Sequence, residues 1–81
     1  MLELYIHAHA LRHGLAEESI RQAWGNFVKR RPRGTDFEVR IGFDAGNREI
    51  GMVGALLEDG DVLILHAKAP AIPSIKKELG E

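Results

Sequence analysis

The sequence predicts an α+β domain in which two N-terminal helices pack on one face of a three-stranded antiparallel sheet, with a fourth strand as an alternative. Two patterns support this prediction. Apolar residues recur with the period of a helix between residues 20 and 27, and they alternate with the period of a strand from residue 37 onward. The chain has 81 residues and no internal repeat or linker, so residues 1–81 are expected to form a single domain.

The composition excludes several classes of protein. Hydrophobic residues make up 44% and charged residues 28% of the chain, a balance typical of a globular domain. A net charge of −1 gives no overall basic field, and the lack of cysteine excludes disulfides, thiolate zinc sites and cysteine nucleophiles. No apolar run approaches the roughly 20 residues of a membrane span, and no signal peptide opens the chain. We therefore expect a cytoplasmic protein without membrane contact or cofactor.

The longer helix is predicted from about Ala16 to Val28. Its apolar side chains follow the spacing i, i+3, i+4 and i+7, namely Ile20, Ala23, Trp24 and Phe27. Glu17 and Glu18 lie in the first turn, where they complement the positive end of the helix dipole. Pro32 and Gly34 follow and prevent the helix from continuing.

A shorter helix over residues 9–13 is predicted before it, with Gly14 as the residue that ends it. Its start is left open, because Leu2, Leu4 and Ile6 also alternate like a strand. His9 and His13 are one turn apart in this helix, a spacing that suits a divalent metal as well as an ordinary helix surface. They are candidate functional histidines. No metal is predicted, because His66 is expected to point away from the helices.

Three strands are predicted in the second half of the chain. The first runs from residue 37 to residue 43, and residues 44–47 have the composition of a turn. The second runs from residue 48 to residue 58, before the two-residue hairpin signal Asp59-Gly60. The third runs from residue 61 to about residue 69, where Pro70 ends it, and residues 74–81 add one helical turn.

The predicted turns determine which side chains meet. Hairpin loops with an even number of residues pair Leu57 with Val62 and Phe43 with Arg48. One face of the sheet then forms the core beneath the Trp24 helix. Its expected members are Phe37, Val39, Ile41, Phe43, Ile50, Met52, Leu56, Leu63, Leu65 and Ala67.

The opposite face gathers charged residues in this register. Its rows are Glu38, Val53 and His66, then Arg40, Gly51 and Lys68, then Gly42 and Glu49. Such a face suits a phosphodiester, with His66 or Glu38 exchanging protons and with Arg40 and Lys68 stabilising the developing charge. Cross-strand ion pairing on a solvated face is the alternative. A three-residue loop at either turn would shift the register by one residue.

Two further segments suggest binding surfaces. The basic residues Lys29, Arg30, Arg31 and Arg33 are close together in the sequence and suit phosphate binding, or form a solvated loop. The apolar residues Ala55, Leu57, Val62 and Ile64 lie on the charged side of the predicted sheet. They suggest an interface with a second copy of the chain or with another protein.

Several short motifs resemble those of a known family. They are His9-Ala10-Leu11-Arg12-His13-Gly14-Leu15, Glu18-Ser19-Ile20, Ala23, Ile41-Gly42-Phe43-Asp44, Gly46-Asn47-Arg48-Glu49-Ile50 and Ile64-Leu65-His66-Ala67. Over residues 6–69 the chain resembles small actinobacterial proteins similar to BrnT-type toxins, which belong with the RelE-like ribonuclease toxins of toxin–antitoxin pairs.

The resemblance implies a RelE-toxin-like α+β fold, metal-independent RNA cleavage and neutralisation by a cognate antitoxin protein. The residues that match functional positions are His9, His13, Arg40, Arg48 and His66, and Arg48 is expected to contact RNA. The chain departs from the family in its nearly neutral charge, in Ala16 at the helix cap and in Lys68 at an expected apolar position. The alternatives are a diverged, inactive toxin and a non-catalytic protein-binding module.

Overall fold

The computed structural model describes residues 3–80, so Leu2 and Glu81 of the predicted terminal elements lie outside the described residues. The elements follow one another as β1 (Leu4–Ile6), η1 (a 3₁₀ helix, Ala8–Leu11), α1 (Glu17–Gly25), β2 (Phe27–Arg33), β3 (Phe37–Phe43), β4 (Glu49–Leu56), η2 (Glu58–Gly60), β5 (Val62–Lys68) and α2 (Pro73–Glu78). Within residues 3–80, no helix is long and apolar enough to cross a membrane.

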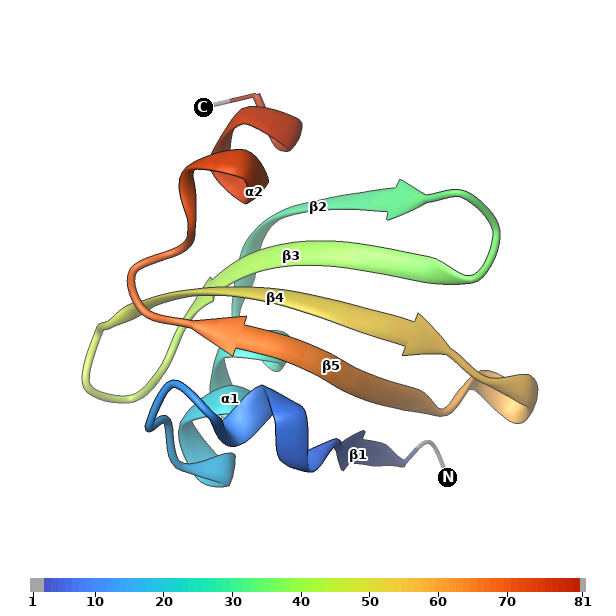
Figure 1. The fold of residues 1–81 in the computed structure, drawn as a ribbon, viewed down its shortest axis with the longest axis horizontal. Helices are drawn as coiled ribbons and strands as arrows, with labels where there is room; N and C mark the ends of the chain where they lie inside the picture. Colours follow the sequence, from blue (N-terminus) through green and yellow to red (C-terminus); the bar gives the residue numbers. More distant parts are fainter. Residues whose placement is uncertain (1–2, 81) are drawn as a thin grey trace.

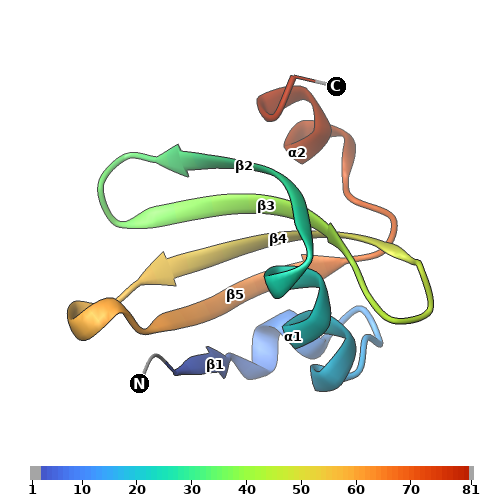
Figure 2. The same ribbon diagram turned by 180° about the vertical axis from the view of Figure 1, so that it is seen from behind.

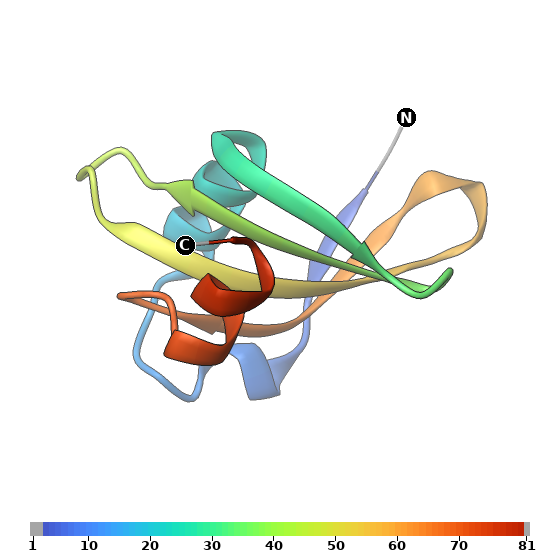
Figure 3. The same ribbon diagram turned by 90° about the horizontal axis from the view of Figure 1, so that it is seen from above.

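The five strands form one mixed sheet in the order β1-β5-β4-β3-β2 (Figure 1). β1 pairs in parallel with β5, and the other neighbouring strands are antiparallel. α1 packs on one face of the sheet, as the view from behind shows (Figure 2). The view from above places α2 on the other face (Figure 3). The predicted arrangement of two N-terminal helices on a three-stranded antiparallel sheet is therefore wrong, although the fold is α+β.

The first half of the chain differs from the prediction in three ways. The N-terminal segment, whose structure the sequence left undecided, forms the strand β1. The segment predicted as a short helix forms η1, a 3₁₀ helix of four residues rather than an α-helix. α1 ends at Gly25, so the segment around Phe27 begins a strand instead of continuing the helix. All seven residues of β2 are exposed, so the strand lacks the alternation of buried and exposed side chains that would predict it from sequence.

The turn between β3 and β4 sets a register one residue away from the predicted one. Asp44 and Arg48 close a three-residue loop through a hydrogen bond from the Asp44 N–H to the Arg48 carbonyl (3.2 Å). Asn47 occupies the left-handed region in this loop, at φ 62°. Phe43 therefore pairs with Glu49 instead of Arg48, and every residue of β3 has a β4 partner one position away from the expected one.

The shifted register divides the apolar residues between two cores. On the α1 face, Ile50, Met52 and Ala67 are fully buried against a group that includes Ile20 and Trp24. On the α2 face, Val39 and Ile41 are fully buried beneath Ala71 and Ile75. The prediction of a single core on one face is wrong. Each helix instead stabilises its own face by covering a separate set of apolar side chains.

Glycines allow both helices to approach the sheet closely. A Cβ at Gly42 would overlap the backbone carbonyl of Ala23 in α1. At Gly51 a Cβ would lie 2.6 Å from that of Ala71, which precedes α2. α1 and the segment leading into α2 therefore pack directly against the backbone of the sheet.

Candidate functional site

β5 presents two of the predicted site residues on the same face of the sheet. His66 pairs with Val53, and Lys68 pairs with Gly51. Val53 packs with the α2 core, and Gly51 faces Ala71, so His66 and Lys68 lie on the α2 side. The predicted pairing of these two residues with β4 is confirmed. The predicted pairing of Leu57 with Val62 is wrong, because Val62 pairs with Leu56 and the bulge between Val53 and Gly54 restores the predicted register only from His66 onward.

The N-terminal segment brings a second imidazole to His66. The His7 N–H donates to the Ile64 carbonyl (2.9 Å), which keeps the chain beside β5 as it leaves β1. Ala10 is fully buried and anchors η1 against the sheet. His13 follows, and its ring centroid lies 5.6 Å from that of His66 in an edge-to-face arrangement. This pairing differs from the prediction, in which His66 pointed away from the helix histidines.

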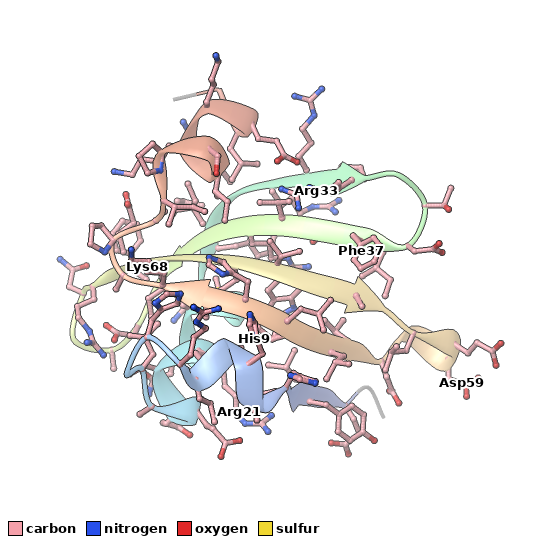
Figure 4. The ribbon with its side chains drawn as sticks, viewed as in Figure 1. His9, Arg21, Arg33, Phe37, Asp59 and Lys68 are labelled. Atoms are coloured by element: carbon pink, nitrogen blue, oxygen red, sulfur yellow. The ribbon has the colours of Figure 1, made fainter. Side chains whose placement is uncertain are left out.

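His9 and Arg12 lie beside these residues. We call the whole group the imidazole cluster; its members are His9, Arg12, His13, His66 and Lys68. Arg12 Nη1 donates to His9 Nε2 at 3.2 Å. His9 is in turn positioned by its backbone N–H, which donates to His7 Nδ1 at 3.0 Å. Figure 4 labels Lys68 at the end of β5 and His9 beside the same strand.

Burial and the cations of the cluster lower the pKa values of His13 and His66. Burial lowers the pKa of His66 below its usual value, and His13, His9, Lys68 and Arg12 lower it further. Desolvation followed by Lys68, Arg12 and His9 lowers the pKa of His13 as well. Each charged group that shifts these two histidines is a cation or another imidazole. A bound anion would therefore meet complementary charge at these two rings.

His66 has one unsatisfied ring nitrogen. Its Nε2 is buried and has no hydrogen-bond partner within residues 3–80. Buried polar atoms are nearly always hydrogen-bonded in folded proteins, so this unpartnered imidazole nitrogen is an exception that a ligand or a water molecule would satisfy. Together with His13, it provides two titratable groups close enough to serve one reacting centre.

The structure places the other two predicted catalytic residues, Glu38 and Arg40, on the opposite face. Arg40 Nε donates to Glu38 Oε2 at 2.5 Å, and its Nη1 donates to the Trp24 carbonyl at 2.9 Å. The guanidinium lies 4.0 Å from the Trp24 ring centroid and 4.4 Å from that of Phe27. The prediction that Arg40 and Glu38 meet His66 and Lys68 is wrong. The three-residue loop shifts the register of β3 by one residue, so the even-numbered side chains of β3 face α1.

The predicted RNA-binding cations are mostly engaged within the protein. Arg30 pairs with Glu38 (2.9 Å), and Arg33 holds both carboxylate oxygens of Glu78 (2.5 and 3.1 Å). This hydrogen bonding lowers the pKa of Glu78 and ties α2 to β2. Arg31 donates to the Glu78 carbonyl, and Lys29 also has an interaction partner. The basic segment thus lies in an edge strand and holds the C-terminal helix, rather than forming a solvated loop.

Arg48, the remaining predicted RNA contact, lies in the β3–β4 turn. Its Nε donates to Asp44 Oδ2 at 3.1 Å and its Nη2 donates to Ser19 Oγ at 3.2 Å. The side chain is nevertheless 53% exposed. It presents a fixed cation on the surface next to the end of β5.

The predicted apolar interface is interrupted. Ile64 is fully buried in the α1 core, and Val62 packs against the same core. Ala55 is partly buried, and Leu57 is 41% exposed. These four residues therefore do not form one continuous exposed strip, because the bulge between Val53 and Gly54 breaks the regular pairing of β4 with β5.

Metal binding finds no support in the described part of the chain. Within residues 3–80, no three His, Cys, Asp or Glu side chains are grouped so as to hold a metal ion. Comparison with known proteins adds no assignment: no family model, no curated protein and no solved structure matches the chain. The case for a function therefore depends on the geometry of the imidazole cluster.

Proposed function

We propose that the protein is a metal-independent endoribonuclease whose reaction centre is the imidazole cluster. The observation that supports this proposal is the pair formed by His13 and His66, 5.6 Å apart, with Arg12 and Lys68 nearby and no carboxylate acting on either ring. Two imidazoles and a cation are sufficient for RNA cleavage, because RNA contains its own nucleophile in the 2′-hydroxyl group.

The reaction is an intramolecular transfer. The neutral imidazole of His66 takes the proton of the 2′-hydroxyl as its oxygen attacks the adjacent phosphorus. The bond from phosphorus to the 5′-oxygen of the next nucleotide breaks, and His13 in its protonated form donates a proton to that oxygen. The products are a 2′,3′-cyclic phosphate and a 5′-hydroxyl group, so no water or metal is consumed.

The surroundings of the two rings affect these roles differently. His66 is the more buried ring, and burial favours its neutral form, as a general base requires. His13 is exposed and can regain its proton from solvent, but its lowered pKa means that the protonated form, which a general acid requires, is favoured in acidic solution. Lys68 and Arg12 would stabilise the negative charge that develops on the phosphate oxygens.

The biological role in the proposal is that of a toxin in a toxin–antitoxin pair, which follows from the resemblance of the motifs at His9, His13 and His66. An antitoxin protein with an acidic segment would neutralise the cluster by occupying the position of the RNA phosphate. Expression of the chain alone should then arrest growth, and coexpression of the antitoxin should restore it.

The proposal is tested with purified protein and single-stranded RNA in EDTA. We expect cleavage by the parent protein, and a loss of roughly 10²–10⁴-fold in His66→Gln and in His13→Gln. His7→Asn is the matched control, since it removes an imidazole outside the pair and keeps a side-chain acceptor for the His9 N–H. Full activity of both glutamine variants would refute the proposed reaction centre.

A non-catalytic protein-binding module is the second candidate function. It is favoured by three exposed side chains at the ends of β3 and β4, Phe37 (38%), Leu56 (40%) and Leu57 (41%). Phe37 pairs with Ala55, and the Leu56 N–H donates to the Asp36 carbonyl, so these residues lie at one end of the sheet, with Leu56 on the α1 face beside Trp24 and Arg40. Light scattering after size exclusion would show a dimer that Leu57→Lys dissociates if this surface joins two copies.

A further inference from the structure

A small hollow lies at the end of β5, next to the proposed reaction centre. It has a volume of about 260 Å³ and is lined by Arg48, Glu49, Ala69 and Pro70. Pockets for drug-sized ligands usually start at roughly 300 Å³, so this hollow suits a smaller group such as a single planar base.

The register places the hollow on the same face as the imidazole cluster. Gly51 of β4 pairs with Ile41 of β3 on one side and with Lys68 of β5 on the other. Glu49 lies two residues before Gly51 in β4 and therefore on the same face, where it pairs with Phe43. Rows two residues apart on one face of a strand are separated by roughly 7 Å. Along this face of the sheet, Lys68 therefore lies between His66 and the hollow at Glu49 and Pro70.

The carboxylate of Glu49 is held in place. Its Oε1 accepts the Ala71 N–H (3.3 Å) and pairs with Lys76 Nζ (3.2 Å). Because Oε1 is fixed at both contacts, the carboxylate is a preorganised acceptor on the wall of the hollow.

Arg48 is the second charged residue that lines the hollow. Asp44 and Ser19 hold its Nε and Nη2 atoms, which fixes the position of the guanidinium. Ala69 and Pro70 add an apolar surface on which a flat ring can rest. The hollow thus combines one carboxylate acceptor, one guanidinium donor and a small apolar wall.

We propose that this hollow binds a guanine base of the RNA, so that a phosphodiester flanking that guanosine reaches Lys68 and the His13–His66 pair. Among the RNA bases, guanine has two donors, N1–H and N2–H₂, on one edge and two acceptors, O6 and N7, on the adjoining edge. The donors suit Glu49, and the acceptors suit Arg48. Uracil would place carbonyl oxygens against the carboxylate, and adenine has a single donor group. This inference rests on the proposed RNA cleavage.

Binding of guanosine 3′-monophosphate and adenosine 3′-monophosphate tests the proposal, with calorimetry for affinity and amide chemical shifts for location. We expect the guanosine nucleotide to bind roughly tenfold more tightly and to shift the Ala69 and Ala71 amides. Glu49→Gln should reduce this preference below about threefold, while keeping a side-chain oxygen for the Ala71 N–H. Glu58→Gln, at the exposed far hairpin, is the matched control and should keep the preference.

A second variant guards against misfolding of Glu49→Gln. Arg48→Lys keeps the charge opposite Asp44 but removes the planar fork, and it should also lose the preference for guanosine. Equal binding of the two nucleotides by the parent protein would overturn the inference. So would an undiminished preference in both variants.

Mapping of cleavage sites separates this inference from the proposed function. Cleavage of RNA without enrichment of guanosine at the cut sites would overturn the base site and leave the ribonuclease proposal standing. Selective binding of the guanosine nucleotide by a protein that leaves RNA intact would do the reverse. Cleavage flanking guanosine, lost in Glu49→Gln but not in Glu58→Gln, would support both.

Discussion

The imidazole ring of His66 lies 5.6 Å from that of His13, although the two residues are at opposite ends of the chain. The contact arises because β1 pairs in parallel with β5 and leads the chain into η1 beside that strand. A short edge strand therefore assembles the part of the surface on which the proposed reaction depends.

The pH dependence of cleavage should reflect the lowered pKa values of His13 and His66. Lys68 is among the charges that lower the pKa of both histidines. We expect cleavage to be maximal below about pH 7 and to fall at higher pH as the general acid loses its proton. Lys68→Gln should raise the pKa of His66, and Lys77→Gln should leave it unchanged. Titration of the histidine ring resonances by NMR measures both effects, and an unchanged His66 pKa in Lys68→Gln would contradict the assigned contact.

Stability should fall when the solution is acidified through the range in which histidine titrates. His66 has a lower pKa in the folded protein than in the unfolded chain, so the unfolded state binds more protons below about pH 6.5. The charged groups around it are His9, Arg12, His13 and Lys68, and all of them disfavour its protonation. Denaturant unfolding at pH 7.5 and pH 5.5 should show a lower free energy at the acidic pH. The difference should shrink in His66→Gln; a larger difference in that variant would contradict the prediction.

Close packing of α1 on the sheet can be tested at a pair of glycines. Gly42→Ala should destabilise the protein by about 1–3 kcal/mol or more, because its Cβ would overlap the Ala23 carbonyl. Gly25→Ala, in α1, is the control. Its Cβ would meet no atom within 4 Å, so the substitution should be neutral or stabilising by up to about 1 kcal/mol. Thermal unfolding measures both, and equal stabilities of the two variants would rule out the close approach of α1 to β3.

Arg40 distinguishes the two faces of the sheet. Arg40→Met should lower the free energy of unfolding by about 1–3 kcal/mol, because Glu38 loses one of its two partners and the Trp24 carbonyl loses its donor. Cleavage per folded molecule should be unchanged, since Arg40 lies on the face opposite His66. Lys77→Met, at an exposed α2 position, controls for the loss of one positive charge. A large loss of activity with unaltered stability would instead favour the predicted cluster of Arg40 with His66.

The sequence predicted those features that depend on local alternation. β3, β4 and β5 lie within the predicted strands, and the pairing of His66 with Val53 and of Lys68 with Gly51 was correct. The register between β3 and β4 could not be predicted, because Asp44–Arg48 suits both an even and a three-residue loop. That choice alone moved Glu38 and Arg40 to the other face.

Two other features left no clear pattern in the sequence. β2 is exposed along its whole length, so its residues show neither the period of a strand nor a buried face. The pairing of β1 with β5 joins segments far apart in the sequence, and a three-residue strand is too short to show a reliable alternation. The meeting of His13 with His66 depends on this pairing, so it became visible only in the structure.

The most direct test of the account is the chemistry of the cleaved ends. RNA incubated with the protein in EDTA should acquire 2′,3′-cyclic phosphate and 5′-hydroxyl termini, in amounts that fall roughly 10²-fold or more in His66→Gln and in His13→Gln but not in His7→Asn. RNA that stays intact with the parent protein, or identical termini produced at full rate by both glutamine variants, would contradict the proposed role of the His13–His66 pair.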